Sequence, residues 1–260
     1  MLTVSIANHK GGVGKTTTAR TLGSVLSQSY GLRVLLVDVD PQASLTRSCN
    51  IMEAAEANMN HVLGGASRGT MALGDVLFEV SDRLFLAPAD ISLSVTELAL
   101  VSRHDRERIL AKSLASLSEH FDLAIIDTAP SLGLLSVNAL VASDGVIVPV
   151  VPEILALRGL SLFLDTLDGI REELNPRLRL LGVLITMFDA RTIHHRDGVA
   201  AIRKTGCSVF NSFIGRSIKV SESAIWGESI TEYEPDHQQA IAYRAFAEEV
   251  LQCLNLAARA

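Results

Sequence analysis

The chain has few cysteines and no long apolar run. Its three cysteines, Cys49, Cys207 and Cys253, are scattered and odd in number, which argues against a disulfide framework and against a metal-binding knuckle. No uninterrupted apolar run reaches the roughly 18 residues that cross a bilayer. An expected strand already begins at Leu2 and leaves no room for a signal peptide. These absences predict a cytoplasmic protein.

Positive charge is also in the minority. The 260 residues include 23 Lys and Arg against 29 Asp and Glu, for a net charge of −6. Such a balance argues against a protein whose whole surface binds nucleic acid, so a basic site would have to be a local cluster. With 48% hydrophobic and 20% charged residues, the chain is typical of an ordered protein, and we expect one domain over residues 1–260.

Apolar, β-branched runs alternate with helical patterns. The expected strands are 2–8, 33–38, 84–87, 122–127, 145–151 and 179–186. The expected helices are 15–29, 104–119, 133–142, 155–174, 193–205 and 237–257. Residues 50–80 are less regular, with Gly64-Gly65 and Gly69 marking loops between short helices. This alternation predicts an α/β fold with a doubly wound, mostly parallel sheet flanked by helices.

A glycine-rich loop follows the first expected strand and opens the first expected helix. It reads Lys10-Gly11-Gly12-Val13-Gly14-Lys15-Thr16-Thr17. In such a loop the backbone N–H groups surround nucleotide phosphates, the second lysine binds them, and the first threonine hydroxyl ligates Mg²⁺. The pattern predicts a site for ATP and Mg²⁺.

The loop departs from the general phosphate-loop pattern in one way. His9 stands where the first glycine is expected, and Lys10 adds a second lysine. A lysine five residues before Lys15 is poorly placed to share the same phosphate oxygens. It could reach a partner subunit's ATP, as an arginine finger does, or it could be a solvated loop charge.

Three acidic residues close expected strands. Asp127 ends one apolar run, as the Mg²⁺-associated acid of a phosphate-loop ATPase does, and Asp38 and Asp40 end another just before Pro41. Ligands of open α/β sheets bind beyond the carboxyl ends of strands, so these carboxylates should meet the phosphate loop. An Asp-Pro pair can also simply start a turn.

Together these segments resemble the ParA family of partition ATPases, which are related to MinD. The likeness rests on residues 10–17, Val37–Gln42 and Ile126–Gly133, and it continues through 136–140, 148–153, 186–192, 221–223 and 230–235. The resemblance implies a phosphate-loop NTPase fold with a deviant Walker A motif, and a homodimer that encloses ATP and Mg²⁺.

The resemblance also implies residue roles. Lys10 would contact the other subunit's nucleotide, Lys15 and Thr16 would bind phosphate and Mg²⁺, and Asp40 would activate water. Asp38 would lie near the metal and Asp127 would be the Walker B acid. Met187 and the segment around Gly215 would hold the adenine, although relatives often carry Ile-Pro-Arg where this chain has Ile214-Gly215-Arg216.

ParA-like dimers bind DNA without sequence preference, and a basic cluster lies between residues 191 and 219. Arg191, Arg216 and Lys219 match positions that the family uses for this purpose. The alternative is a set of ordinary surface charges. No aromatic residues are interleaved with the cations, so base-specific stacking is not indicated. Because the phosphate loop begins by residue 10, we expect no N-terminal DNA-binding extension.

Other branches of this superfamily fit less well. The C-terminal segment carries Glu248 and Glu249, unlike the basic membrane helix of MinD relatives. The cysteines do not suit an iron–sulfur cluster between subunits, and three tyrosines do not make the tail of a tyrosine kinase.

We therefore expect an ATPase that segregates plasmid or chromosomal DNA with a ParB-like partner and is nucleoid-associated when ATP is bound. The alternatives are a positioning ATPase for a non-DNA cargo, working through a cargo adaptor protein, and a nucleotide switch without a DNA role.

Overall fold

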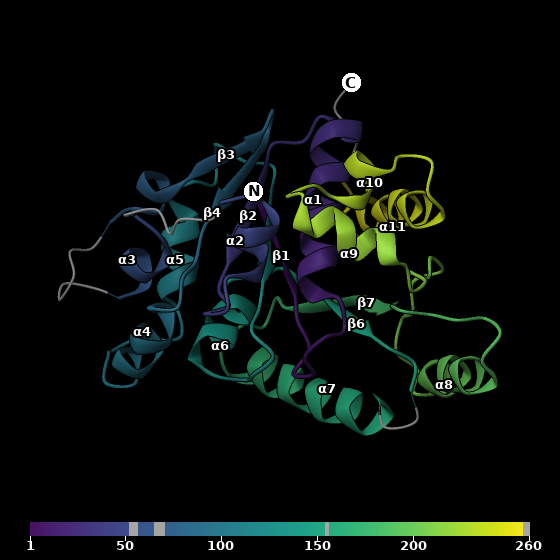
Figure 1. Ribbon diagram of the computed structural model, residues 1–260. Helices are drawn as coiled ribbons and strands as arrows, with labels where there is room; N and C mark the ends of the chain where they lie inside the picture. Colours follow the sequence, from purple (N-terminus) through teal and green to yellow (C-terminus); the bar gives the residue numbers. More distant parts are fainter. Residues whose placement is uncertain (52–56, 65–70, 154–155, 257–260) are drawn as a thin grey trace.

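A single sheet with the strand order β3-β4-β2-β5-β1-β6-β7 forms the centre of the computed structural model, which describes residues 1–51, 57–64, 71–153 and 156–256 (Figure 1). All neighbouring strands are parallel except β3, which pairs antiparallel with β4 at one edge. The strands are β1 (Leu2–Ile6), β2 (Val34–Asp38), β3 (Phe78–Ser81), β4 (Leu84–Ala87), β5 (Leu123–Asp127), β6 (Gly145–Val150) and β7 (Arg179–Ile185). The parallel strands are continuous apolar segments because both faces of the sheet are covered.

Helices cover both faces of the sheet. They are α1 (Lys15–Tyr30), α2 (Ser44–Ser48), α3 (Met59–Leu63), the 3₁₀ turn η1 (Leu73–Val76), α4 (Leu93–Leu100), α5 (Ile109–Ala115), α6 (Leu134–Val141), α7 (Ala156–Glu173), α8 (Ile193–Lys204), α9 (Ile218–Ile225), α10 (Ile230–Tyr233) and α11 (Gln238–Leu254). On one face α1 and α11 pack on Val4, Ile6, Val34 and Leu36. On the other, α3 to α6 pack on β2 and β5, and α7 and α8 pack on β6 and β7.

The predicted fold class is confirmed, and the predicted strands and long helices differ from the observed ones mainly at their ends. Sequence analysis did not predict β3, α2, α4, α9 or α10, and the helix expected at 104–119 is observed only as α5. The expected helix positions 155 and 257, and the loop residues Gly65 and Gly69, lie outside the described residues. Within the described part of the chain, no helix is long and apolar enough to cross a membrane.

The strand order brings three predicted strand ends together. β5 lies between β2 and β1, and its last residue, Asp127, is in register with Asp38 on one side and Ile6 on the other. The loop between β1 and α1 leaves this same edge of the sheet. The carboxyl edge of the central strands therefore gathers the residues of the candidate site.

Candidate nucleotide site

The glycine-rich loop has a backbone that only glycine adopts without strain. Gly12 and Gly14 have positive φ angles of 71° and 87°, and α1 begins directly after Gly14. Neighbouring side chains hold the loop: Asn8 donates through Nδ2 to the Pro149 carbonyl at 2.7 Å, and Thr186 donates through Oγ1 to the Val13 carbonyl at 2.9 Å. The loop is thus fixed from two strands before any ligand arrives.

Lys15 lies at the base of this loop with only 7% of its surface exposed. Its Nζ donates to the Lys10 carbonyl oxygen at 3.2 Å. Burial lowers the pKa of the Lys15 ammonium, and the nearby carboxylates of Asp127 and Asp40 partly oppose that shift. A phosphate bound in the loop would add a further negative charge that favours the ammonium form.

Thr16 and Asp127 form a pair suited to a hard divalent cation. Thr16 donates through Oγ1 to Asp127 Oδ2 at 2.7 Å, whereas the buried Oδ1 of Asp127 accepts no hydrogen bond from the described residues. Burial, with the nearby Asp38 carboxylate, raises the pKa of Asp127 well above its usual range. A carboxylate with an unused buried oxygen beside a hydroxyl fits Mg²⁺, which takes few protein oxygens and keeps water and phosphate ligands. Accordingly, the described residues contain no cluster of three or more His, Cys, Asp or Glu able to hold a metal by themselves.

Asp38 is fully buried and bonded to the loop that follows it. Its Oδ2 accepts from the N–H and the hydroxyl of Thr46, at 2.9 and 2.7 Å, and its Oδ1 accepts from the Asp40 N–H at 3.1 Å. Burial raises the pKa of Asp38 to about 6, although the Thr46 hydrogen bonds favour its ionised form. Asp40 is 8% exposed, and its Oδ1 accepts from the Gln42 N–H at 2.9 Å. Asp38 therefore orders the loop that presents Asp40.

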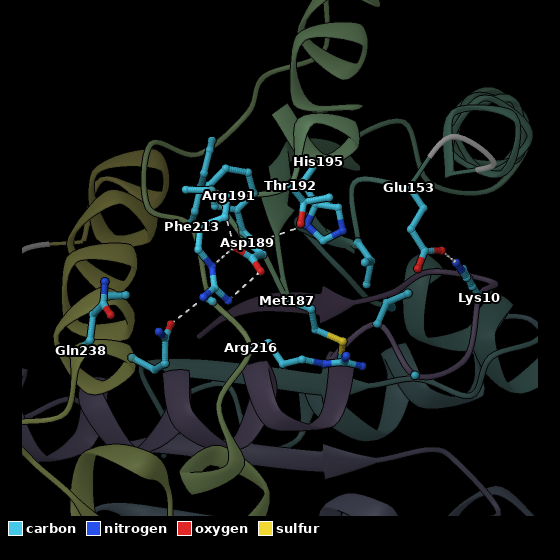
Figure 2. A pocket seen from close by; sticks show the side chains of 18 of the residues that line it. Lys10, Glu153, Met187, Asp189, Arg191, Thr192, His195, Phe213, Arg216 and Gln238 are labelled. Carbon is cyan, nitrogen blue, oxygen red and sulfur yellow. Dashed lines mark hydrogen bonds and ion pairs between the residues drawn. The ribbon is translucent and has the colours of Figure 1, made fainter. Parts of the chain in front are cut away.

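The side chain of Lys10 pairs with Glu153, a residue that follows β6. Its Nζ lies 2.7 Å from Glu153 Oε2, and both side chains are about half exposed, at 46% and 54%. Figure 2 shows this pair at one side of a hollow of about 990 Å³ whose other walls include Met187, Asp189, His195 and Arg216. Among the described residues, the partner of the Lys10 ammonium group is Glu153, in a half-exposed ion pair.

Met187 and Gly215 lie between two hollows. Both residues line the large hollow and also a smaller one of about 440 Å³ that includes Gly14 and Thr17. Gly215 donates its backbone N–H to Oε1 of the buried Gln239 at 2.6 Å, which a proline could not do. A Cβ at this position would come within 2.8 Å of Gln239 Nε2. The glycine that departs from the family pattern therefore has a specific partner in this chain.

Two of the three predicted DNA-binding cations share one hollow. Arg191 and Arg216 line the large hollow, and Arg191 contacts both carboxylate oxygens of Asp189 at 3.1 Å (Figure 2). Lys219 does not line it: its Nζ lies 3.0 Å from Glu222 and 3.2 Å from Glu234. Arg191 and Lys219 therefore carry internal counter-charges in this conformation.

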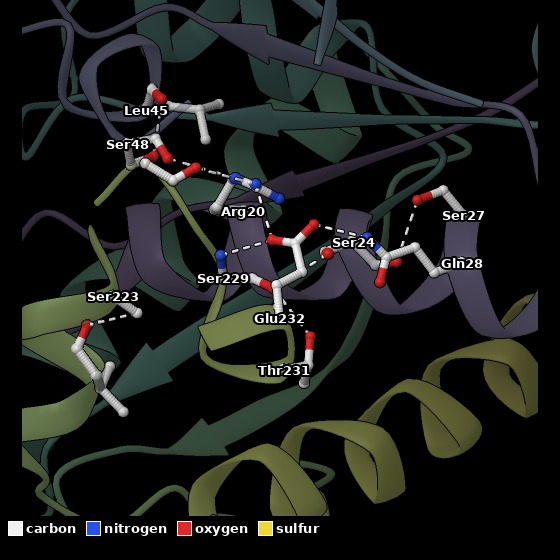
Figure 3. A network of polar contacts seen from close by, with 12 residues as sticks. Arg20, Ser24, Ser27, Gln28, Leu45, Ser48, Ser223, Ser229, Thr231 and Glu232 are labelled. Carbon is white, nitrogen blue, oxygen red and sulfur yellow. Dashed lines mark hydrogen bonds and ion pairs between the residues drawn. The ribbon is translucent and has the colours of Figure 1, made fainter. Parts of the chain in front are cut away.

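A buried ion pair links α1 to segments far along the chain. Arg20, whose side chain is 5% exposed, contacts Glu232 at 2.9 Å and donates to the carbonyl oxygens of Ser48 and Gly227 (Figure 3). Glu232 also accepts from the Ser229 N–H at 2.7 Å. This network joins the helix that carries Lys15 and Thr16 to the ends of α2 and α9 and to α10.

Sequence analysis gave no role to several residues that shape the site. Asn8 and Thr46 hold loop backbone, Glu153 pairs with Lys10, and Arg20 anchors the buried network. One signal was available: Arg20 is a charged residue in the middle of a helix that is otherwise buried there. The role of Glu153 depends on a contact across 143 residues, which no local pattern predicts.

Comparisons with known proteins agree with this geometry. The family model described as an AAA domain matches residues 1–180. The chromosome-partitioning ATPase Soj of Thermus thermophilus is 40% identical over 251 residues, covering 95% of this chain and 94% of that protein. A plasmid partition protein from Borrelia burgdorferi superposes with a TM-score of 0.75 at 27% identity, over 96% of this chain and 98% of that one.

A further solved structure carries ligands. It is a cobyrinic acid a,c-diamide synthase from Mycobacterium smegmatis with bound ATP analogue and magnesium, which superposes with a TM-score of 0.86 at 36% identity. The match covers 98% of this chain and 96% of that one.

Proposed function

The chain belongs to the ParA family of partition ATPases, and we propose that ATP makes it a dimer that binds DNA non-specifically until a partner stimulates hydrolysis. It is an ATPase that uses ATP and Mg²⁺. The dimer, the DNA and the partner are the proposed part. The observation that supports the dimer is Lys10, an additional lysine whose ammonium group is held by a half-exposed ion pair with Glu153, which it would exchange for another subunit's nucleotide.

The proposed chemistry divides between the loop and the strand ends. Lys15 and the loop N–H groups bind the phosphates, while Thr16 and Asp127 hold Mg²⁺, which neutralises phosphate charge when bound. Asp40, on the loop that Asp38 orders, positions and activates the attacking water. Lys10 stabilises the charge that develops on the partner subunit's ATP.

A second part of the proposal concerns DNA. Arg191, Arg216 and Lys219 would contact phosphates from both subunits, and doubling the contacts by dimerisation makes binding depend on ATP. The net charge of −6 supports a requirement for this local cluster, because the rest of the surface repels DNA. Binding would fall steeply with salt.

Variants of the two lysines and of Asp40 test the ATP dimer. Lys15→Ala should lose nucleotide binding, whereas Lys10→Ala should still bind ATP but fail to dimerise or to hydrolyse it. Asp40→Ala should hold ATP and remain a dimer. Light scattering with ATP and a phosphate-release assay give both readouts. Unchanged dimer mass and turnover in Lys10→Ala would remove Lys10 from the interface.

An Arg191→Ala/Arg216→Ala double variant tests the DNA site. It should keep ATP-dependent dimerisation and lose DNA binding, while the matched control Arg171→Ala, another exposed arginine paired with an aspartate, should bind DNA normally. Equal DNA affinity of the double variant and the unaltered chain would favour a nucleotide switch without a DNA role.

The partner and the cargo are also proposed. A ParB-like centromere-binding protein would make the cargo a plasmid or chromosome and place the ATP form on the nucleoid. A positioning ATPase for a non-DNA cargo would keep the same ATP chemistry with an adaptor protein instead. A neighbouring gene for a ParB-like protein with centromere repeats would support the first, and a cargo operon the second.

A further inference from the structure

The outward face of α4 is apolar, although a surface helix normally presents polar side chains to water. Four side chains on α4 and its flanking turns repeat at intervals of three or four residues, and each is 57–75% exposed: Ile91, Val95, Leu98 and Val101. We call these four residues the α4 stripe. The opposite face, with Leu93, Thr96 and Leu100, is buried. Neither the exposed stripe nor the buried face contains a charged side chain. An exposed apolar stripe of this kind is typical of a contact surface.

The one charged side chain of α4 connects this helix to the nucleotide site. Glu97 Oε1 accepts a hydrogen bond from the Leu135 N–H at 3.3 Å, in the first turn of α6. The same carboxylate occupies the space beside Gly133, where an added Cβ would collide with it. Gly133 immediately precedes α6 and ends the segment that starts at Asp127. Glu97 thus caps α6 from a neighbouring helix and fixes the end of that segment.

A second connection joins α6 to the chain that follows α4. Asn138, in the middle of α6, donates to the Arg106 carbonyl at 2.7 Å and accepts from the Leu110 N–H at 3.2 Å. In Figure 1, α4 lies at the lower left of the molecule, next to α3 and α6. A ligand that displaces α4 together with the segment that follows it would therefore act on α6 at two points.

The α4 stripe ends beside a positive surface. The segment 103–112 has four cations and two carboxylates: Arg103, Arg106, Arg108, Lys112, Asp105 and Glu107. Both carboxylates are already engaged, Asp105 by Lys112 and Glu107 by Arg106. An excess of positive charge beside an apolar stripe, on a chain of net charge −6, complements an apolar segment that carries acidic residues at one end.

We propose that the α4 stripe is the docking surface for an amphipathic helix of a partner protein. That helix would have apolar residues at matching spacing and carboxylates at the end that lies over residues 103–112. Its binding would change hydrolysis through Glu97 and α6. The coupling to hydrolysis rests on the proposed function, in which a partner stimulates the ATPase. The docking of a helix on the α4 stripe is independent of that function.

Two other occupants fit the surface less well. A helix that lies on a lipid surface carries Lys or Arg on its own polar face, and α4 has none. A second copy packed antiparallel would place one carboxylate, that of Asp90, against a segment with four cations and two carboxylates, which leaves part of the positive excess unmatched.

Photo-crosslinking in the host cell identifies the occupant. A photoreactive amino acid is placed at Val95 of the full chain, and the matched control is the same group at Ile241, an equally exposed apolar position on α11. The proposal predicts cross-links from position 95 to one helical peptide with the apolar spacing and acidic end described above. Cross-links to phospholipid, to a second copy, or to the same set of products as position 241 would overturn it.

The purified partner then tests the coupling. Stimulated ATP turnover should need at least about tenfold more partner for Val95→Ser/Leu98→Ser, with basal turnover and ATP-dependent DNA binding unchanged, and Ile241→Ser should respond normally. Glu97→Ala should still cross-link through position 95 but lose the stimulation. Unaltered stimulation in both the stripe variant and Glu97→Ala would overturn the coupling. If the unaltered chain fails to bind DNA, that result would count against the proposed DNA-binding function and not against docking on the α4 stripe.

Discussion

Releasing Lys10 from Glu153 should tighten the proposed ATP dimer. In the single chain the two side chains form an ion pair with Nζ and Oε2 2.7 Å apart. To reach a nucleotide on another subunit, Lys10 must first break that pair. Glu153→Gln removes the charge of the carboxylate but keeps its size, so the lysine loses its partner in the monomer and nothing in the phosphate loop changes.

The expected effect follows from the exposure of the pair. Both side chains are about half exposed, so the pair is worth what a surface ion pair is worth, about 0.2–1 kcal/mol. A symmetric dimer breaks two such pairs, so the change is about 0.4–2 kcal/mol, or about 2- to 30-fold in the dimer Kd. The effect should shrink with added salt, since salt screens the pair.

Sedimentation of the chain with a non-hydrolysable ATP analogue measures this Kd directly. Asp82→Asn is a matched control because it removes another exposed ion pair, with Arg83, at the β3–β4 turn. The control should dimerise like the unaltered chain. A Glu153→Gln chain that dimerises equally or more weakly would refute the reasoning and would indicate that Glu153 itself contacts the other subunit.

Three further predictions concern buried groups. Gly215→Pro removes the donor to the buried Gln239 and should lower the free energy of unfolding in urea by about 1–3 kcal/mol. The double variant Gly215→Pro/Gln239→Ala should be little less stable than Gly215→Pro alone. If the losses of unfolding free energy of the two single variants simply add, the hydrogen bond between these residues is not supported. Arg20→Met leaves Glu232 without its buried partner and should cost about 3–5 kcal/mol by the same assay, with a loss below about 1 kcal/mol contradicting the network. Burial raises the pKa of Cys49 to about 11, which makes its thiolate about 100-fold scarcer at pH 8, so iodoacetamide should modify Cys49 only after urea unfolding. Equal rates of Cys49 modification in the native and the urea-unfolded chain would contradict this burial.

The fold class was predictable because the signals for it are local. Continuous apolar strands, the glycines of the loop and the strand-end aspartates each mark their own positions, and the sheet then brings them together. The helix α4 was missed because its apolar residues lie on two faces, which hides the helical period. The short edge strand β3 was also missed, because it forms by pairing with β4 and its own four residues give little indication of a strand.

The meeting of the candidate phosphate and metal residues was predictable from the sequence, and the contacts that hold them were less so. Lys15, Thr16 and Asp127 belong to sequence motifs, and Thr16 and Asp127 meet across 111 residues as expected. By contrast, Thr46, Glu153 and Gln239 act through long-range contacts whose partners only the folded chain reveals. Lys219 is a mixed case, because Glu222 lies three residues later on the same helix, a spacing that sequence can indicate, whereas its contact with Glu234 needs the folded chain.

DNA binding by the purified chain with ATP, with ADP and without nucleotide, at two salt concentrations, tests the central claim most directly. Binding should require ATP. With three cations in each of two subunits, the logarithm of the affinity should fall against the logarithm of salt with a slope of about −5, a loss of about 10³ between 50 and 200 mM. DNA binding that is absent in every state, or equal with ATP and ADP, would contradict a nucleotide-gated DNA carrier.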